Sequence, residues 1–122
     1  MKLLRKLLTF VRPKPKPLDA PVIFSEEHFQ REAPEAFSAS WSDVQRITGY
    51  KIDMFAWDEI RVEFALQGGN TVVVSEESPG FPEFMAEVER RFPSAVGWHS
   101  KISQPAFAPC TSVLHVSGRE HR

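Results

Sequence analysis

The sequence predicts an α+β fold in which one amphipathic helix packs across a curved, mainly antiparallel sheet of about five strands. In residues 59–67 large apolar side chains recur at every second position, which is typical of a strand with one buried face. Residues 81–92 instead repeat apolar side chains at helical spacing. A third observation is a basic N-terminal arm, residues 1–17, which we expect to lie outside the folded domain.

The arm combines positive charge with an apolar face. It carries a formal charge of +6 without a single acid, whereas the rest of the chain carries −7. Its leucines recur at helical steps, and the prolines at positions 13, 15 and 17 predict an extended spacer. A helix this short is marginal in water, so its apolar face needs a partner. The predicted contact residues are Lys2, Leu3, Leu4, Arg5, Lys6, Leu7, Leu8, Arg12, Lys14 and Lys16.

The first half of the domain is rich in β-formers. Residues 21–31 predict a strand and turn or a short hairpin, because Val22, Ile23 and Phe24 are separated from Phe29 by polar residues. Residues 36–53 predict two strands or one bent strand. Gly49 lies within this run and suggests a bulge or a bend.

The strand at residues 59–67 is followed by Gly68, Gly69 and Asn70, which tolerate positive φ. Residues 71–75 are again β-branched, so the pair predicts a hairpin. Three consecutive valines at positions 72–74 indicate apolar cover on both faces of this second strand, or an edge covered by another element.

Both ends of the helix at residues 81–92 are specified. Pro82 falls in the first turn, where its missing donor is tolerated, and Pro93 prevents continuation. Prolines in the segment that follows predict an irregular crossing, and residues 111–117 predict a last strand. That strand could pair with an edge of the sheet or with a second copy of the protein.

Length and composition bound the architecture. With 122 residues, 42% of them hydrophobic and 11% aromatic, the chain suits a single domain at residues 18–117 and a tail at 118–122. The lone Cys110 cannot form an intramolecular disulfide, which favours a reducing cytoplasm. Arg5 and Lys6 interrupt the first apolar run, which argues against a signal peptide or a membrane span. We expect a cytoplasmic protein that could lie at the membrane periphery through the arm.

Residues capable of catalysis or metal binding are present but match no motif. Cys110 with His99 or His115 could form a nucleophile and base, and Asp53 and Asp58 flank an aromatic loop. A small enzyme using Asp53, Asp58, His99 or Cys110 is therefore the rival hypothesis. His115 and His121, with His99 or Glu120, lack the spacing of a metal site. No catalytic residue, metal, cofactor or small-molecule ligand is predicted.

The arm admits several partners. An anionic membrane would attract its cations and could bury its leucines. Its apolar face could instead pack on its own domain or on a neighbouring subunit, with the cations over acidic surface. Nucleic acid ranks third, because the folded part is acidic and no nucleic-acid motif is present.

Residues 41–116 resemble small, uncharacterised bacterial proteins through the phrases WSDVQRI, EESPGF and PAFA and through Trp98. The order of several strands followed by one amphipathic helix is also similar to a pleckstrin-homology-like roll. That resemblance implies binding of a lipid, a peptide or a protein without naming which. The sequence departs from such rolls in its low predicted strand count before the helix and in the thirty or so residues after the helix.

These observations favour a non-catalytic binding protein, in which an acidic domain recognises a protein partner and the arm contacts a membrane or another subunit. An immunity protein that neutralises a toxin is one member of this class. Self-association is a further expectation.

Overall fold

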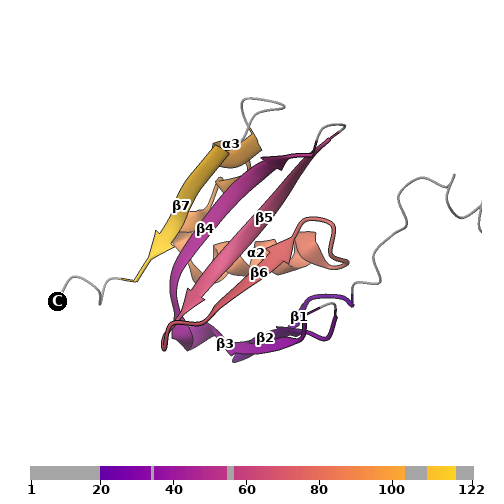
Figure 1. The fold of residues 1–122 in the computed structure, drawn as a ribbon. Coiled ribbons are helices and arrows are strands. Elements are labelled where there is room, and N and C mark those ends of the chain that lie inside the picture. Colours follow the sequence, from indigo (N-terminus) through magenta and orange to yellow (C-terminus); the bar gives the residue numbers. More distant parts are fainter. Residues whose placement is uncertain (1–19, 34, 55–56, 104–109, 118–122) are drawn as a thin grey trace, which may run out of the picture.

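The structure is a computed structural model that describes residues 20–33, 35–54, 57–103 and 110–117 (Figure 1). Within these residues the fold is α+β, with two antiparallel sheets and two α-helices. The predicted class is therefore confirmed. The strands are divided differently from the prediction, because they form a three-stranded and a four-stranded sheet instead of one sheet of about five strands.

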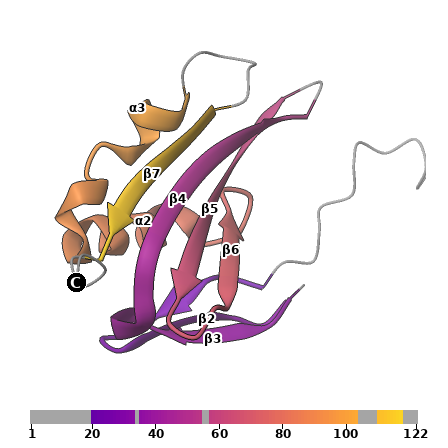
Figure 2. The ribbon, with the colours of Figure 1, turned by 60° about the vertical axis from the view of Figure 1, so that its left-hand side comes forward.

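The three-stranded sheet is built from the N-terminal part of the domain. Strands β1 (Ile23–Phe24), β2 (His28–Arg31) and β3 (Phe37–Ser40) pair in that order. The hairpin predicted at residues 21–31 is thus confirmed. Phe29 is fully buried on the inner side, whereas Ile23 is 51% exposed. The sheet lies across one end of the larger sheet, where it closes the core (Figure 2).

The four-stranded sheet has the order β6-β5-β4-β7. A 3₁₀ turn, η1 (Trp41–Asp43), separates β3 from β4 (Val44–Asp53), so residues 36–53 form two strands as one of the two alternatives predicted. Strands β5 (Asp58–Leu66) and β6 (Thr71–Ser75) form the predicted hairpin. Gly68 and Gly69 have φ of 96° and 93°, which explains why glycines stand in this turn. The last strand, β7 (Cys110–Val116), pairs with β4, which comes from the middle of the chain.

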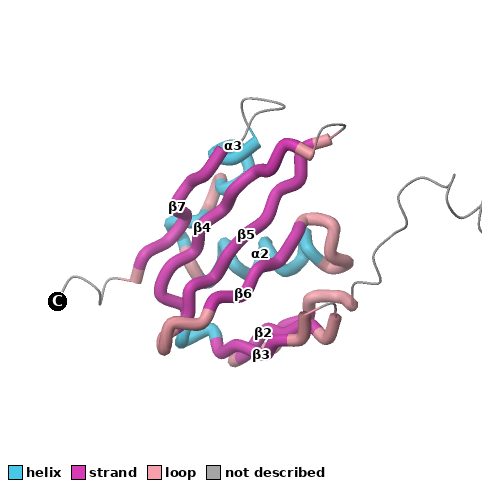
Figure 3. The backbone as a smooth tube through the Cα atoms, viewed as in Figure 1, coloured by secondary structure: helices cyan, strands magenta, loops and turns pink. Residues whose placement is uncertain are grey.

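Both α-helices cover one face of the four-stranded sheet, and the views in Figures 1 to 3 agree on this arrangement. Helix α2 (Phe81–Arg91) follows the predicted bounds closely and buries Phe81, Phe84, Met85 and Val88. A second 3₁₀ turn, η2 (Pro93–Ala95), and a short helix, α3 (Trp98–Ser103), follow it. The sequence analysis expected no helix at residues 98–103 and so missed α3, which buries Ile102. The prolines that predict an irregular crossing, at positions 105 and 109, lie outside the described residues.

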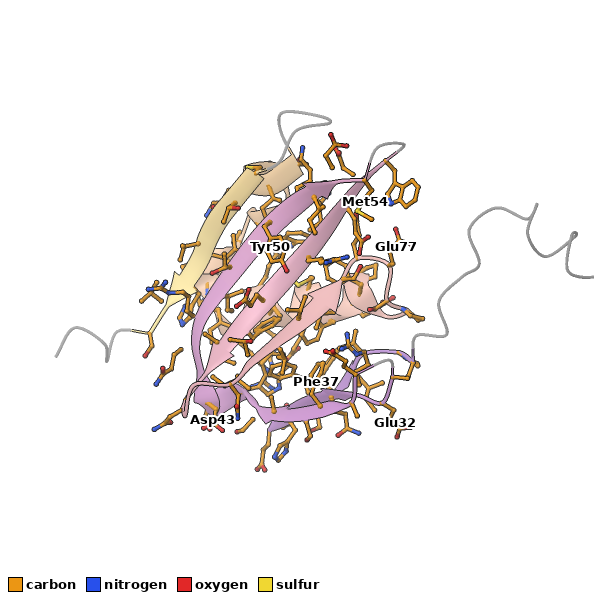
Figure 4. All side chains as sticks on the ribbon, in the orientation of Figure 1. Glu32, Phe37, Asp43, Tyr50, Met54 and Glu77 are labelled. Atoms are coloured by element: carbon orange, nitrogen blue, oxygen red, sulfur yellow. The ribbon has the colours of Figure 1, made fainter. Side chains whose placement is uncertain are left out.

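The core is centred on aromatic rings from elements that are far apart in sequence. The Phe84 ring lies 5.5 Å from Phe29, 5.6 Å from Phe64 and 5.8 Å from Trp41. Phe29, Phe64 and Phe84 are fully buried, so these contacts join both sheets to α2. The opposite face of the four-stranded sheet carries Tyr50, which projects away from the helices (Figure 4).

Gly49 lies in β4 for a reason other than the predicted bulge. It pairs in regular register with Val62 of β5 and Ser112 of β7, and the register shifts of β4 lie elsewhere. A Cβ atom at this position would overlap the Ile102 side chain of α3. The missing side chain therefore allows α3 to approach the sheet closely.

Candidate partner-binding site

A pocket of about 500 Å³ opens where the β1–β2 turn, η1 and the end of α2 meet. No single segment forms it, because its walls come from three parts of the chain. The lining residues are Glu26, Glu27, Ser40, Trp41, Ser42, Arg91 and Phe92.

Aromatic rings form the apolar part of this pocket. Trp41 is 5% exposed, and its Nε1 donates a hydrogen bond to the backbone carbonyl of Ser25 at 3.0 Å. The Trp41 and Phe92 ring centroids lie 6.2 Å apart, and Phe92 is half-buried. Because the indole donor is satisfied and the ring is packed, this wall is fixed before any ligand arrives.

Arg91 forms a second rigid wall. Its guanidinium lies 4.6 Å from the centroid of the Trp41 ring, and its Nη2 donates to the carbonyl of Glu26 at 2.7 Å. Its Nε donates to Glu87 at 2.6 Å. These contacts neutralise the cation and tie α2 to the β1–β2 turn, so Arg91 serves the architecture of the pocket.

The rim offers acceptors to a ligand. The Glu26 side chain is 91% exposed and forms a 3.8 Å ion pair with Arg91, and Glu27 is also exposed. The hydroxyls of Ser40 and Ser42 lie 2.9 Å apart on the same rim. Carboxylates and hydroxyls beside the half-buried Phe92 ring suit a cationic side chain that carries an aliphatic stem, such as lysine or arginine.

Glu87 holds in place the Arg91 side chain that lines the pocket. Hydrogen bonding from Arg90 is the largest influence on its carboxyl group and, together with Arg91, lowers the pKa of Glu87 despite partial desolvation. Because the pKa is lower in the folded state, Glu87 stabilises the fold at neutral pH, and this contribution is lost as the pH falls through the lowered pKa.

We therefore expect the free energy of unfolding to decline more steeply in acid for the native chain than for Glu87→Gln. The difference should develop below the ordinary pKa of 4.5. Urea denaturation at a series of pH values on either side of this pKa measures it. Parallel curves for the two proteins would contradict the assignment.

The residues of the rival catalytic hypothesis lie mainly at the other end of the four-stranded sheet. Asp53 and Asp58 are cross-strand partners at the end of the β4–β5 pair. Cys110 is the register partner of Lys51, and its Sγ contacts the carbonyl of Lys101 at 3.5 Å. His99 lies exposed on α3 with its ring 5.2 Å from that of Trp98.

Lys51 is the polar residue that sequence reasoning missed in this region. Its side chain is 2% exposed, and its Nζ lies 3.6 Å from Asp58 and donates to the carbonyl of Ser103 at 2.7 Å. A buried lysine is normally paired, and these contacts provide that pairing. The geometry thus gives Lys51 and Asp58 a structural role in joining β4, β5 and α3.

Glu59 also has structural partners. It accepts hydrogen bonds from the Ser75 hydroxyl at 2.7 Å and from Arg61 Nε at 3.1 Å. Nearby, the Glu76 carboxylate accepts the backbone N–H of Ile60 at 2.9 Å. Glu59 of β5 and Glu76, the residue after β6, thus cross-link the paired ends of these two strands.

The remaining predicted residues divide into two groups. His115 of β7 packs its ring 4.6 Å from Phe92 and lies 3.3 Å from the Ser94 hydroxyl. The contact residues of the arm, and His121 and Glu120, lie outside the described residues. Among the described residues, no three His, Cys, Asp or Glu side chains gather as a metal site.

Comparisons of the chain with models of protein families, with curated proteins and with solved structures returned no match. Among the helices in the described part of the chain, none combines the length and the apolar character that crossing a bilayer requires.

Proposed function

We propose that this chain is a non-catalytic binding protein whose acidic domain recognises a basic protein partner. The observation that carries the proposal is the pocket at Trp41, where fixed aromatic and hydroxyl groups lie beside the exposed carboxylates of Glu26 and Glu27. The excess of seven negative charges outside the arm supports a partner of opposite sign. Cytoplasmic localisation remains part of the proposal, on the ground of the lone cysteine.

Charge complementarity sets the expected behaviour of this interaction. Attraction between an acidic surface and a basic partner accelerates association and weakens as salt is added. The aromatic wall adds contact area that salt does not screen. Binding should therefore weaken with ionic strength without disappearing.

Charge reversal at the rim tests the proposal. The full chain, Glu26→Lys/Glu27→Lys and the matched control Glu32→Lys/Glu35→Lys are used to capture proteins from the native cell. All four of these glutamates are exposed, and the two pairs occupy opposite ends of the three-stranded sheet. We expect the native chain and the control to capture a protein of high isoelectric point and the rim variant to lose it. Equal capture by all three would overturn the proposed site.

The arm supplies the second contact in this proposal, with an anionic membrane or with another subunit. The comparison is between the full chain and a full-length variant in which Lys2, Arg5, Lys6, Arg12, Lys14 and Lys16 are all Gln. Sedimentation with vesicles containing phosphatidylserine should fall in the variant and at high salt if the contact is a membrane. Equal sedimentation by both proteins would remove these cations from membrane binding.

An immunity protein that neutralises a basic toxin is the most specific form of this proposal. The similarity of element order to a pleckstrin-homology-like roll supports binding as the class of function. Strand β7 follows the helices here, whereas such a roll closes with its helix, so the likeness concerns the order of the earlier elements.

A further inference from the structure

The two edges of the four-stranded sheet differ in how they are protected. Strands β6 and β7 occupy the two ends of the sheet order (Figures 1 and 3). In the described residues, no strand pairs with the outer side of either one. An edge strand presents backbone donors and acceptors to any strand that reaches it, so natural proteins usually guard long edges with charges, prolines or covering elements.

The edge at β6 is guarded. The Arg31 side chain of β2 is almost fully buried, and its Nη1 donates to the backbone carbonyl of Val73 at 3.0 Å. The same guanidinium donates twice to the carbonyl of Glu35, at 3.0 and 3.3 Å. Arg31 thereby occupies an acceptor of β6 and brings the three-stranded sheet against this edge.

The edge at β7 has the opposite character. Its seven residues, Cys-Thr-Ser-Val-Leu-His-Val, include no Asp, Glu, Lys, Arg or Pro. Val113 is 51% exposed and Val116 is 36% exposed. Val113 pairs with Thr48, which shares a face of β4 with Tyr50, so Val113 lies on the sheet face that the helices leave open.

One guarding device is present at β7, and it limits where pairing can occur. The register with β4 shifts between Ile47 and Thr48, which places Leu114 as the extra residue of a bulge. The shift leaves residues 110–113 in regular register with β4. Residues 110–113, which carry no charged side chain, are therefore the part of β7 with which another strand can pair.

We propose that β7 pairs antiparallel with β7 of a second copy of this chain about a two-fold axis. An edge strand is self-complementary under such an axis, because each copy offers the other the same donors and acceptors in reverse order. The strand itself brings no like charges together, because β7 carries no Asp, Glu, Lys or Arg. The result is an eight-stranded sheet in which Ser112 of both copies lies on the axis and Val113 of each copy faces Thr111 of the other, so that the two Val113 side chains are diagonal neighbours on one face.

The test is the oligomeric state of the full chain by analytical ultracentrifugation. We expect a concentration-dependent dimer, and Val113→Lys should raise its dissociation constant by about tenfold or more, because the two added cations then lie diagonally across the axis within reach of each other. Thr71→Lys is the matched control, since it adds the same charge to an exposed position on the other edge strand. Circular dichroism confirms that both variants are folded.

Complementary charges make the test specific. Val113→Glu should also weaken the dimer, whereas an equimolar mixture of Val113→Lys and Val113→Glu should restore it as a heterodimer. A native chain that stays monomeric at every concentration would overturn the proposal. So would a Val113→Lys protein that dimerises as well as the native chain, because the contact would then lie elsewhere, for example at the arm. The proposal does not depend on the pocket at Trp41, so either can fail alone.

Discussion

Replacing Phe84 by alanine should lower the free energy of unfolding by about 3–5 kcal/mol, the largest loss that we expect from a single substitution in this domain. Phe84 is fully buried, and its ring contacts Phe29, Phe64 and Trp41. Removing it deletes apolar area and leaves a cavity bounded by three rigid rings, which cannot collapse easily. Urea denaturation followed by circular dichroism measures the loss.

Phe24→Ala is the matched control for this substitution. It removes the same atoms from a residue that is 40% exposed and whose ring also faces Trp41 and Phe84, at 6.5 and 6.4 Å. Because water already reaches part of this ring, the loss should be clearly smaller. Equal losses at the two positions would show that Phe84 is not the centre of the core.

Gly49→Ala should lower the free energy of unfolding by about 1–3 kcal/mol, although alanine is ordinarily the better residue in a strand. The added Cβ would overlap Ile102, which is fully buried and has little room to move. Ile102→Val removes the Cδ1 atom at the point of overlap and by itself should cost about 0.5–1.5 kcal/mol.

A double-mutant cycle separates steric overlap from a general effect of glycine. Gly49→Ala/Ile102→Val should be more stable than the sum of the two single losses predicts, because the valine makes room for the alanine. Thermal or urea denaturation of the four proteins gives the coupling energy. Additive losses would mean that the close approach of α3 is not why glycine occupies this position.

The elements predicted most accurately are those whose signals are local. Helix α2 carries its own apolar spacing and both of its boundary signals, so Pro82 and Pro93 placed its ends within a residue or two. The β5–β6 hairpin likewise combines strict alternation with glycines in its turn. In both cases the decisive information lies within about fifteen consecutive residues.

The features that sequence reasoning missed depend on residues far apart in the chain. Helix α3 has only six residues and is held by contacts of Ile102 with the sheet, so its own pattern was too short to distinguish it from a loop. Lys51 is buried because it lies on the same face of β4 as Ile47 and Gly49. Apolar residues also occur on the other face of this strand, so the sequence did not show which face is buried. The division into two sheets depends on η1, a turn of three residues.

The candidate site was missed for the same reason. Trp41 lies about fifty positions before Arg91 and Phe92, and nothing in the local sequence shows that they share a pocket. The one available signal is the acidic pair Glu26 and Glu27 beside an expected turn, and no local pattern connects this pair with the end of the helix. Long-range assembly of this kind is where functional surfaces most often escape sequence patterns.

The sheet order also determines when the domain can complete itself during synthesis. Strand β4 ends at Asp53, but its neighbour β7 begins only at Cys110, so more than fifty residues must leave the ribosome between the two. Until β7 arrives, β4 is an edge strand of a sheet that contains only β4, β5 and β6. Pairing over such a distance is slow and exposes the unfinished chain to misassembly, so we expect shielding by chaperones to matter most until β7 has emerged.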